Sequence, residues 1–304
     1  MIPEMERRLA AFVDRKDEMA RFCEMLETRD KPIMVVWGEA GLGKTSLFFR
    51  MMHECSQRKL RKADLVWSDT RNHDYVAVMC KIRDNLGADC FQSFSQLVNA
   101  PASSQIEVKI DVGVTGEVNV ASGMQVDHSK VGDVAAAIIK DSTFVLPMSD
   151  RAALERNRMI RLTDEFIRGL GQALQTEPLV IFFDAVEKMS ADTSKWVWGE
   201  LLRAVADGTV GQIVVVLCGR EKPQFDRDME FIVEEAELKP LGEADIFEYL
   251  TKRCQDEKVD TVVNEEARLM MATMLFNTTK GKPDEVAYAV EGALKGWKKR
   301  ASGR

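Results

Sequence analysis

Hydrophobic and polar positions along this chain form two patterns, one typical of buried strands and one of helices, which follow one another in turn. Continuous apolar runs of strand length predict buried strands of a parallel sheet. These runs cover residues 33–37, 63–69, 179–184 and 211–221. Apolar residues at three- and four-residue spacing predict helices over residues 18–26, 46–55, 75–86 and 151–174. Strands that alternate with helices predict an α/β fold, in which a parallel sheet carries helices on both faces.

The pattern changes towards the C-terminus, where only helical periodicity remains. It predicts three helices, over residues 243–254, 265–276 and 284–297. We therefore predict an α/β domain over residues 1–237 and a small helical subdomain over residues 238–304. The last ten residues, KGWKKRASGR, are strongly basic, and we expect this end to be irregular and solvated.

Residues 103–130 interrupt the α/β pattern with strict alternation of apolar and polar residues. The alternating apolar residues are Ile106, Val108, Ile110, Val112 and Val114. Such alternation, punctuated by Gly116 and Gly123, predicts a β-ribbon inserted into the α/β domain. Two interpretations remain open: a hairpin that folds over its own domain, and an arm that binds another chain.

Composition excludes several classes of protein. The 304 residues are 45% hydrophobic and 30% charged, with a net charge of −7, which argues against a broad nucleic-acid surface. No apolar run approaches the roughly 20 residues of a membrane span, and the N-terminus lacks a signal-peptide core. The six cysteines form no Cys-x-x-Cys pair, so we expect buried free thiols and a cytoplasmic location. Three dispersed histidines give no zinc site.

The clearest motif follows the first apolar run, in the stretch GEAGLGKTS. Glycines allow the backbone to approach a ligand, and successive N–H groups at a helix N-terminus bind anions. Gly38, four intervening residues, Gly43, Lys44 and Thr45 complete the P-loop pattern. In this motif Lys44 reaches the β- and γ-phosphates, and Thr45 ligates Mg²⁺. The predicted phosphate cradle comprises Gly38, Glu39, Ala40, Gly41, Leu42, Gly43, Lys44, Thr45 and Ser46.

Two further strand ends carry candidate chemistry. The run LVIFFD ends at Asp184, and an acid in this position holds the magnesium shell in P-loop NTPases. Glu187 either polarises the attacking water or is a capping or solvated carboxylate. Arg220 ends the next strand, at the same sheet edge. It either stabilises the γ-phosphate or pairs at the surface with Glu221 or Asp226.

These segments together resemble STAND-type NTPases, the signal-transducing, NACHT-like branch related to AAA+ ATPases. FVDRKDE, residues 12–18, resembles the family's N-terminal Phe-Val-Gly-Arg-Glu motif, and GEAGLGKTS resembles its P-loop. FFDAVEK resembles its Walker B segment, and VVVLCGREKP its next strand motif, which ends in arginine. LKPLGEADIFEYL, residues 238–250, resembles the start of the lid helices, and TKGKPDEVAYAV, residues 279–290, resembles the Gly-x-Pro motif. The resemblance spans about residues 10–295 outside the ribbon.

The resemblance implies a three-layer αβα P-loop NTPase fold with a C-terminal helical lid, ATP or ADP as ligand, and Mg²⁺. It implies adenine contacts from Phe12, Val13 and Arg15, and a nucleotide contact from Pro283. From the residues alone, Gly281-Lys282-Pro283 is equally a helix stop followed by a helix start. No Asn-Lys-x-Asp element is present to favour GTP.

Two departures from the family pattern are present, the first bearing on the shape of the N-terminal loop and the second on hydrolysis. Asp14 stands where the family usually has glycine, and Ala185 follows Asp184 where typical AAA+ enzymes carry a catalytic glutamate. We therefore expect ATP hydrolysis that is slow, depends on Glu187, or needs a partner. The catalytic candidates are Lys44, Asp184, Glu187 and Arg220, and the metal ligands are Thr45 and Asp184.

The sequence supports a main functional hypothesis and two rivals. The first is an ATP-driven switch that controls assembly with a protein partner, an effector chain or copies of itself, in stress, immune or antiphage-type defence signalling. The second is an AAA+-like loader or regulator acting on DNA, supported by the basic tail and opposed by the acidic balance. The third is a nucleotide-bound scaffold without turnover.

Overall fold

The computed structural model describes residues 12, 13, 15–67, 74–100, 110–112, 118–120, 124–125, 148–175 and 178–301. The chain forms two compact units, one of residues 1–91 with 167–304 and one of residues 92–166. The division predicted at residues 237 and 238 separates parts within the first unit and stays a prediction.

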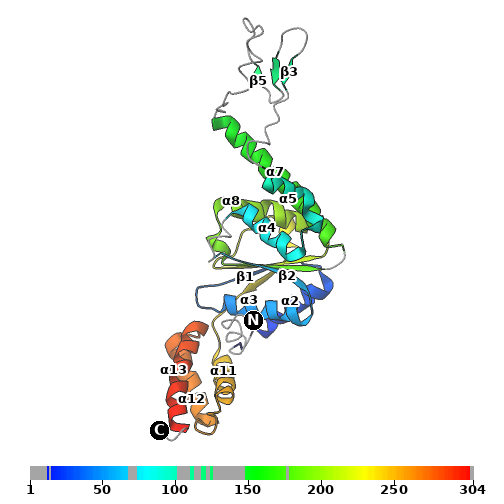
Figure 1. The fold of residues 1–304 in the computed structure, drawn as a ribbon. Helices are drawn as coiled ribbons and strands as arrows, with labels where there is room; N and C mark the ends of the chain where they lie inside the picture. The colour runs from blue at the N-terminus through cyan, green and yellow to red at the C-terminus, as the bar shows by residue number, and fades with distance from the viewer. Residues whose placement is uncertain are drawn as a thin grey trace. The chain divides into compact units, whose positions relative to one another are not determined.

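A five-stranded parallel sheet forms the centre of the first unit (Figure 1). Its strands are β1 (Ile33–Trp37), β2 (Arg61–Val66), β6 (Leu179–Asp184), β7 (Ile213–Gly219) and β8 (Val233–Glu237). They lie in the order β2-β6-β7-β1-β8, and every neighbouring pair is parallel. The register pairs Trp37 with Gly219 and Asp184 with Cys218, so the strand ends with candidate chemistry meet at one edge. The predicted α/β fold with a parallel sheet is confirmed.

Helices cover both faces of this sheet (Figure 1). The helices α2 (Lys16–Thr28) and α3 (Lys44–Gln57) lie on one face, and α4 (Tyr75–Leu86) and α8 (Ala191–Trp196) lie on the other. After α8 come a π-helical turn (Val197–Leu201), α9 (Leu202–Ala206) and α10 (Arg227–Glu230). Phe22 of α2 and Phe48 of α3 pack on Phe182, with ring centroids 6.1 and 5.4 Å apart. This aromatic core holds α3, and with it the P-loop, against the sheet.

The strand β8 was not predicted, because its sequence VEEAE has few apolar residues. It lies at the edge of the sheet, where Glu234 forms ion pairs with Arg21 at 3.2 Å and Lys31 at 2.9 Å. Lys222 pairs with Glu235 at 2.7 Å. Cationic side chains from outside the strand therefore offset the charge repulsion between the glutamates of this edge strand.

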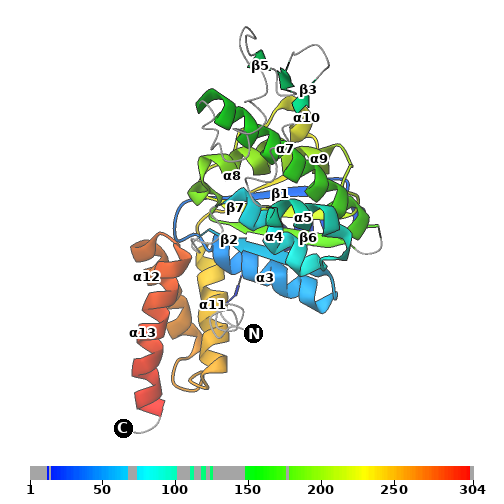
Figure 2. The same cartoon turned by 45° about the horizontal axis from the view of Figure 1, so that its top comes forward.

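Three C-terminal helices pack on one another around their own apolar core (Figure 2). They are α11 (Glu243–Asp256), α12 (Glu265–Thr279) and α13 (Pro283–Ala301). Ile246, Leu250, Val286 and Val290 are fully buried in this core. The basic end is helical through Ala301, so the expectation of an irregular tail was wrong for this part. Leu294, directly before this end, is buried in the core, and Lys298 pairs with Glu257, so both contacts hold the last turns of α13.

The second unit, described by itself, contains α5 (Gln92–Asn99) and the N-terminal part of α7 (Met148–Ala173). The short strands β3 (Ile110–Val112), β4 (Val118–Val120) and β5 (Met124–Gln125) pair antiparallel in that order. Most of the predicted β-ribbon over residues 103–130 lies outside the described residues, so the ribbon as a whole stays a prediction.

All six cysteines are free. Cys55, Cys218 and Cys254 are buried as expected, whereas Cys23, Cys80 and Cys90 are only half-buried. No described helix is long and apolar enough to cross a bilayer.

Candidate functional site

The P-loop joins the end of β1 to the start of α3, and its glycines adopt the backbone conformations that the motif requires. Gly41 and Gly43 have φ values of 84° and 85°, in the left-handed region that favours glycine. In the described part of the chain, the backbone N–H groups of Gly41, Gly43 and Lys44 have no hydrogen-bond acceptor. A positive φ at alternate residues and free N–H groups at a helix N-terminus are the elements of an anion-binding nest.

The Lys44 side chain bends back over this loop. Its Nζ donates hydrogen bonds to the carbonyl oxygens of Gly38 at 2.5 Å and Glu39 at 2.7 Å. Burial lowers the pKa of Lys44, while the negative charge of Glu187 opposes this shift. The ammonium group is thus held at the loop, where its positive charge adds to that of the N–H groups and favours an anion.

Thr45 and Asp184 meet beside the loop. The Thr45 hydroxyl donates to Asp184 Oδ2 at 3.1 Å, and the Ala185 N–H donates to Asp184 Oδ1 at 3.0 Å. Asp184 is only 6% exposed, and this burial raises the pKa of its carboxyl group, against the hydrogen bond from Thr45. The two side chains form an oxygen-only donor pair, the type that Mg²⁺ prefers together with phosphate and water.

Glu187 and Arg220 also meet at this edge of the sheet. The Glu187 Oε1 and Arg220 Nε atoms are 3.1 Å apart. The surface alternatives for Arg220 are wrong, because its ion pair is with Glu187, whereas Asp226 pairs with Arg203 at 3.4 Å. The structure therefore brings Lys44, Thr45, Asp184, Glu187 and Arg220 into one cluster.

Arg15 connects the N-terminal loop to two other segments. Its guanidinium donates to the carbonyl oxygens of Leu42 at 3.3 Å and Lys239 at 2.6 Å, and it lies 3.7 Å from Glu18. The side chain is 7% exposed, and the residue has a φ of 65°. Arg15 thus ties the P-loop to the segment between β8 and α11, a structural role that its assignment as an adenine contact did not include.

A pocket of about 510 Å³ lies next to the P-loop. Seven predicted contact residues line it: Phe12, Val13, Arg15, Leu42, Gly43, Ser46 and Pro283. The structure adds residues that the sequence analysis missed, namely Leu241, Tyr249, Asp284, Val286, Ala287, Tyr288, Glu291 and Lys295. Several of these lie on one face of α13 at three- and four-residue spacing. This spacing is visible in the sequence, but it does not by itself indicate a ligand. The remaining P-loop residues do not line this pocket, and Glu39 and Ala40 are exposed.

The lid helices contact the P-loop directly. The Asp284 N–H points to the Gly41 carbonyl oxygen at 3.4 Å, and a Cβ placed on Gly43 would lie 3.7 Å from Pro283 Cγ. The Leu241 N–H donates to the Gly281 carbonyl oxygen at 2.8 Å. The start of α13 therefore lies against the loop, and the segment before α11 is joined to the segment before α13.

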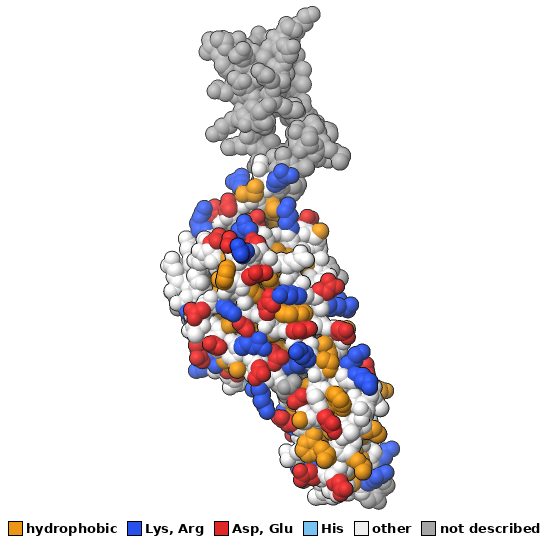
Figure 3. All heavy atoms as spheres, turned by 180° about the vertical axis from the view of Figure 1, so that it is seen from behind, with side chains coloured by type: hydrophobic (Ala, Val, Ile, Leu, Met, Phe, Trp, Pro, Cys, Tyr) orange, Lys and Arg blue, Asp and Glu red, His pale blue; other side chains and the backbone are white. Residues whose placement is uncertain are grey.

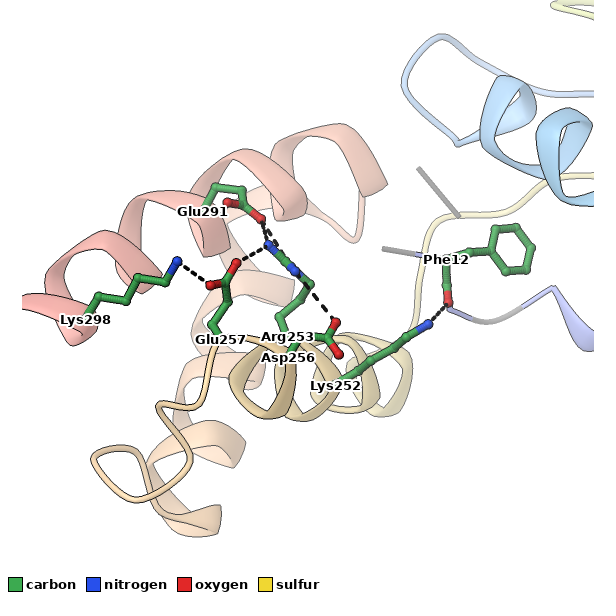
Figure 4. Close-up of polar contacts among 7 residues, drawn as sticks. All are labelled: Phe12, Lys252, Arg253, Asp256, Glu257, Glu291 and Lys298. Carbon is green, nitrogen blue, oxygen red and sulfur yellow. Dashed lines mark hydrogen bonds and ion pairs between the residues drawn. The ribbon is translucent and has the colours of Figure 1, made fainter. Parts of the chain in front are cut away.

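Ion pairs and hydrogen bonds organise the pocket's lid side (Figure 4). Lys252 Nζ donates to the Phe12 carbonyl oxygen at 3.0 Å and so holds the N-terminal loop against α11. Arg253 pairs with Glu291 and, at 3.4 Å, with Glu257, which in turn pairs with Lys298. These contacts join α11 to α13.

The molecular face drawn in Figure 3 carries acidic and basic side chains intermingled, without a continuous basic surface. No group of three or more acidic, histidine or cysteine side chains among the described residues could hold a metal by protein ligands alone. A metal site at Thr45 and Asp184 would therefore be completed by phosphate and water.

Comparisons with known proteins agree with this geometry. The family model for the AAA ATPase domain matches residues 11–216. No curated protein is significantly similar in sequence. Among solved structures, Drosophila ORC bound to DNA has a TM-score of 0.52 and 14% identity, over 97% of this chain and 63% of that chain. At this identity the likeness supports the fold alone.

Two further structures are similar in part. Cdc6p from Pyrobaculum aerophilum has a TM-score of 0.49 and 13% identity, over 93% of this chain and 63% of that chain. A STAND protein with a tetratricopeptide repeat sensor from Pyrococcus horikoshii has a TM-score of 0.44 and 12% identity, over 90% of this chain and 28% of that chain. The present chain thus spans less than two thirds of each of these three chains.

Proposed function

The chain belongs to the AAA ATPase domain family, and from this premise we propose that it binds ATP with Mg²⁺ and acts as a STAND-like switch. In this proposal the nucleotide state sets the position of the lid, which controls assembly with a protein partner, an effector chain or further copies. The setting is stress or antiphage-type defence signalling. The resemblance of the motifs to STAND proteins supports this finer assignment.

The residues at the sheet edge fit a nucleotide and its metal. Free backbone N–H groups and Lys44 suit phosphate oxygens, and the oxygen pair of Thr45 and Asp184, 3.1 Å apart, suits Mg²⁺. The bound metal would supply charge stabilisation to the phosphates. Phe12, Val13, Tyr249 and the other pocket residues would hold the adenosine part.

Hydrolysis in this site would be slow or dependent on a partner. Water would attack the γ-phosphorus as the bond to the β,γ-bridging oxygen breaks, giving ADP and phosphate, and the water proton would pass to Glu187. Ala185 leaves no carboxylate next to Asp184, and Glu187 is already paired with Arg220. A base in an ion pair is poorly available, which is the physical reason to expect low turnover.

One observation carries the switch proposal: the contact between the P-loop and α13. Pro283 and Asp284 lie against Gly43 and Gly41, the residues that would surround the phosphates. A ligand that displaces these glycines towards α13 would therefore press on its first residues, and one that draws them away would weaken the contact. In this proposal, these contacts connect nucleotide binding to the position of the lid.

The test measures nucleotide affinity by calorimetry, and mass and shape by light scattering and small-angle scattering. The conditions are ATP, ADP and a non-hydrolysable ATP analogue, each with Mg²⁺. We expect ATP and ADP to give different shapes or oligomer sizes, and Lys44→Ala to weaken ATP binding by about 100-fold or more. Lys195→Ala, an exposed lysine on α8, is the matched control. Identical shape and size under all three conditions would refute the switch, and absent ATP binding would refute the site.

A second candidate is an ATPase that acts on DNA. The ordered basic end of α13, with Lys295, Lys298, Lys299 and Arg300, favours it, and one protein of similar fold was solved bound to DNA. The net charge of −7 opposes it. DNA binding with a steep loss of affinity in added salt would favour this candidate over the switch.

A further inference from the structure

Two oppositely charged side chains beside the P-loop, Glu187 and Arg220, form an ion pair with each other. Glu187 Oε1 lies 3.1 Å from Arg220 Nε, and the side chains are 27% and 59% exposed. This is the only ion pair of either residue among the described residues. The candidate base and the candidate phosphate-binding arginine are thus paired with each other.

Backbone features place Glu187 in this position. Ala185 has a φ of 59°, an uncommon left-handed conformation for alanine, which turns the chain sharply after β6. The 3₁₀ turn Val186–Lys188 then approaches β7 so closely that a Cβ on Gly219 would lie 2.7 Å from Val186 Cγ2. The absence of a side chain at Gly219 lets this turn reach the end of β7, next to Arg220. The ion pair is therefore favoured by the path of the backbone.

The same two residues act on Lys44. Glu187 is the charged group with the largest influence on the Lys44 pKa, and Arg220 acts in the opposite direction. Lys44, Glu187 and Arg220 therefore share one electrostatic environment at the P-loop. A phosphate bound there would attract Arg220 and repel the Glu187 carboxylate.

We propose that Glu187 competes with the terminal phosphate of ATP for Arg220, so that this ion pair sets the preference of the site for ATP over ADP. The inference deepens the proposed function and rests on it. With ADP, Arg220 keeps its pair with Glu187. With ATP, Arg220 exchanges the carboxylate for the terminal phosphate, and Glu187 becomes free to accept a proton from water.

A role of Glu187 in this competition predicts a result that a role as catalytic base alone does not predict. Removing the charge of Glu187 frees Arg220 in advance, so it must strengthen ATP binding even though it impairs hydrolysis. Partly exposed ion pairs are weak, so we expect Glu187→Gln to raise ATP affinity about two- to fivefold. ADP affinity should rise less, because ADP has no γ-phosphate to bind the freed arginine. We expect Arg220→Gln to lower ATP affinity about tenfold, because a charge-assisted hydrogen bond to phosphate is lost, with little effect on ADP.

The experiment measures the dissociation constants of ATP and ADP with Mg²⁺ by calorimetry, for the wild-type chain, Glu187→Gln, Arg220→Gln and the double variant. In the double variant the gain from Glu187→Gln disappears, because there is no arginine left to free. Thermal melting of each variant checks that it is folded.

Two surface ion pairs provide matched controls. Arg203, 65% exposed in its pair with Asp226, matches Arg220, and Glu235, 32% exposed in its pair with Lys222, matches Glu187. Arg203→Gln and Glu235→Gln should leave both dissociation constants unchanged.

Two results would overturn the proposal in distinguishable ways. An unchanged or lowered ratio of ATP to ADP affinity in Glu187→Gln would overturn this inference while the proposed function stands. A wild-type chain that binds neither nucleotide would overturn both.

Discussion

The candidate site has two sides, and they are held in different ways. The phosphate side consists of the P-loop and the ends of β6 and β7, which emerge from the middle of a buried sheet. The base side consists of the loop at Phe12 and Val13 with α11 and α13, joined by separate contacts such as Lys252 to the Phe12 carbonyl oxygen. The first side is fixed by the core, whereas the second can change without unfolding the sheet.

The two sides also contain residues of very different exposure. Asp184, on the phosphate side, is 6% exposed, whereas Tyr288, on the base side, is 85% exposed. Few buried contacts and exposed hydrogen bonds are typical of regions that open at low free-energy cost. We predict that motion in this protein is concentrated in the lid, and the following experiments test it.

The largest expected effect is at the fastening of the lid. Gly281 has a φ of 72°, and a Cβ there would lie 2.1 Å from the Leu241 carbonyl oxygen. Gly281→Ala must displace the backbone, at a cost of about 3 kcal/mol. Hydrogen exchange should show faster opening of α11, α12 and α13, with the sheet amides unchanged.

Gly292→Ala is the matched control within α13. No atom lies within 4 Å of a Cβ at this position, so alanine should stabilise the helix by about 1 kcal/mol. Equal exchange rates in the two alanine variants would show that the Gly281 contact does not hold the lid.

A smaller effect is expected from Asp184 on the phosphate side. Burial raises the pKa of its carboxyl group, so the ionised form destabilises the nucleotide-free protein at neutral pH. Asp184→Asn should therefore raise the free energy of unfolding by about 1 kcal/mol. This advantage shrinks as the pH falls through the raised pKa, because the wild-type carboxyl group then becomes neutral. Denaturant melts of both proteins between neutral and mildly acidic pH measure it.

The same variant should lose the contribution of Mg²⁺ to ATP binding. Removal of Mg²⁺ with a chelator should weaken ATP binding by the wild-type chain but not by Asp184→Asn. An Asp184→Asn chain that is less stable at neutral pH, or that still responds to Mg²⁺, would contradict the assignment of this carboxylate.

The smallest effect is expected on the base side, from Lys252→Met. Loss of one charge-assisted hydrogen bond to the Phe12 carbonyl oxygen should weaken ATP binding about fivefold. Inorganic triphosphate, which lacks the base, should bind as before. Lys195→Met on α8 is the control, and an equal loss for ATP and triphosphate would show that the two sides are not separate.

The phosphate side could be predicted from sequence because each part depends on a short segment. A run of apolar residues, a glycine pattern and Lys44 suffice to define β1, the P-loop and α3. Asp184 and Arg220 followed from the rule that parallel strands end at one edge of the sheet. Their mutual contacts needed the structure, since the Glu187 to Arg220 pair depends on the turn at Ala185.

The base side could be predicted only in part, because it depends on how distant segments pack. Tyr249 and Tyr288 belong to helices that were predicted, but no local pattern shows that they line the same pocket. Arg15 hydrogen bonds to the Lys239 carbonyl oxygen, 224 residues away in sequence. The edge strand β8 escaped prediction for a similar reason, since its acids depend on Arg21 and Lys31.

The hydrogen bond from Leu241 to Gly281 closes the chain of α11 and α12 into a loop whose two ends are joined at its base. This contact favours movement of α11 and α12 as one piece. Rotation about the segment at Leu238 would carry all three helices together, because they share one apolar core. A small displacement at the P-loop would then become a larger displacement at the C-terminal end of α13, where a neighbouring molecule could detect it.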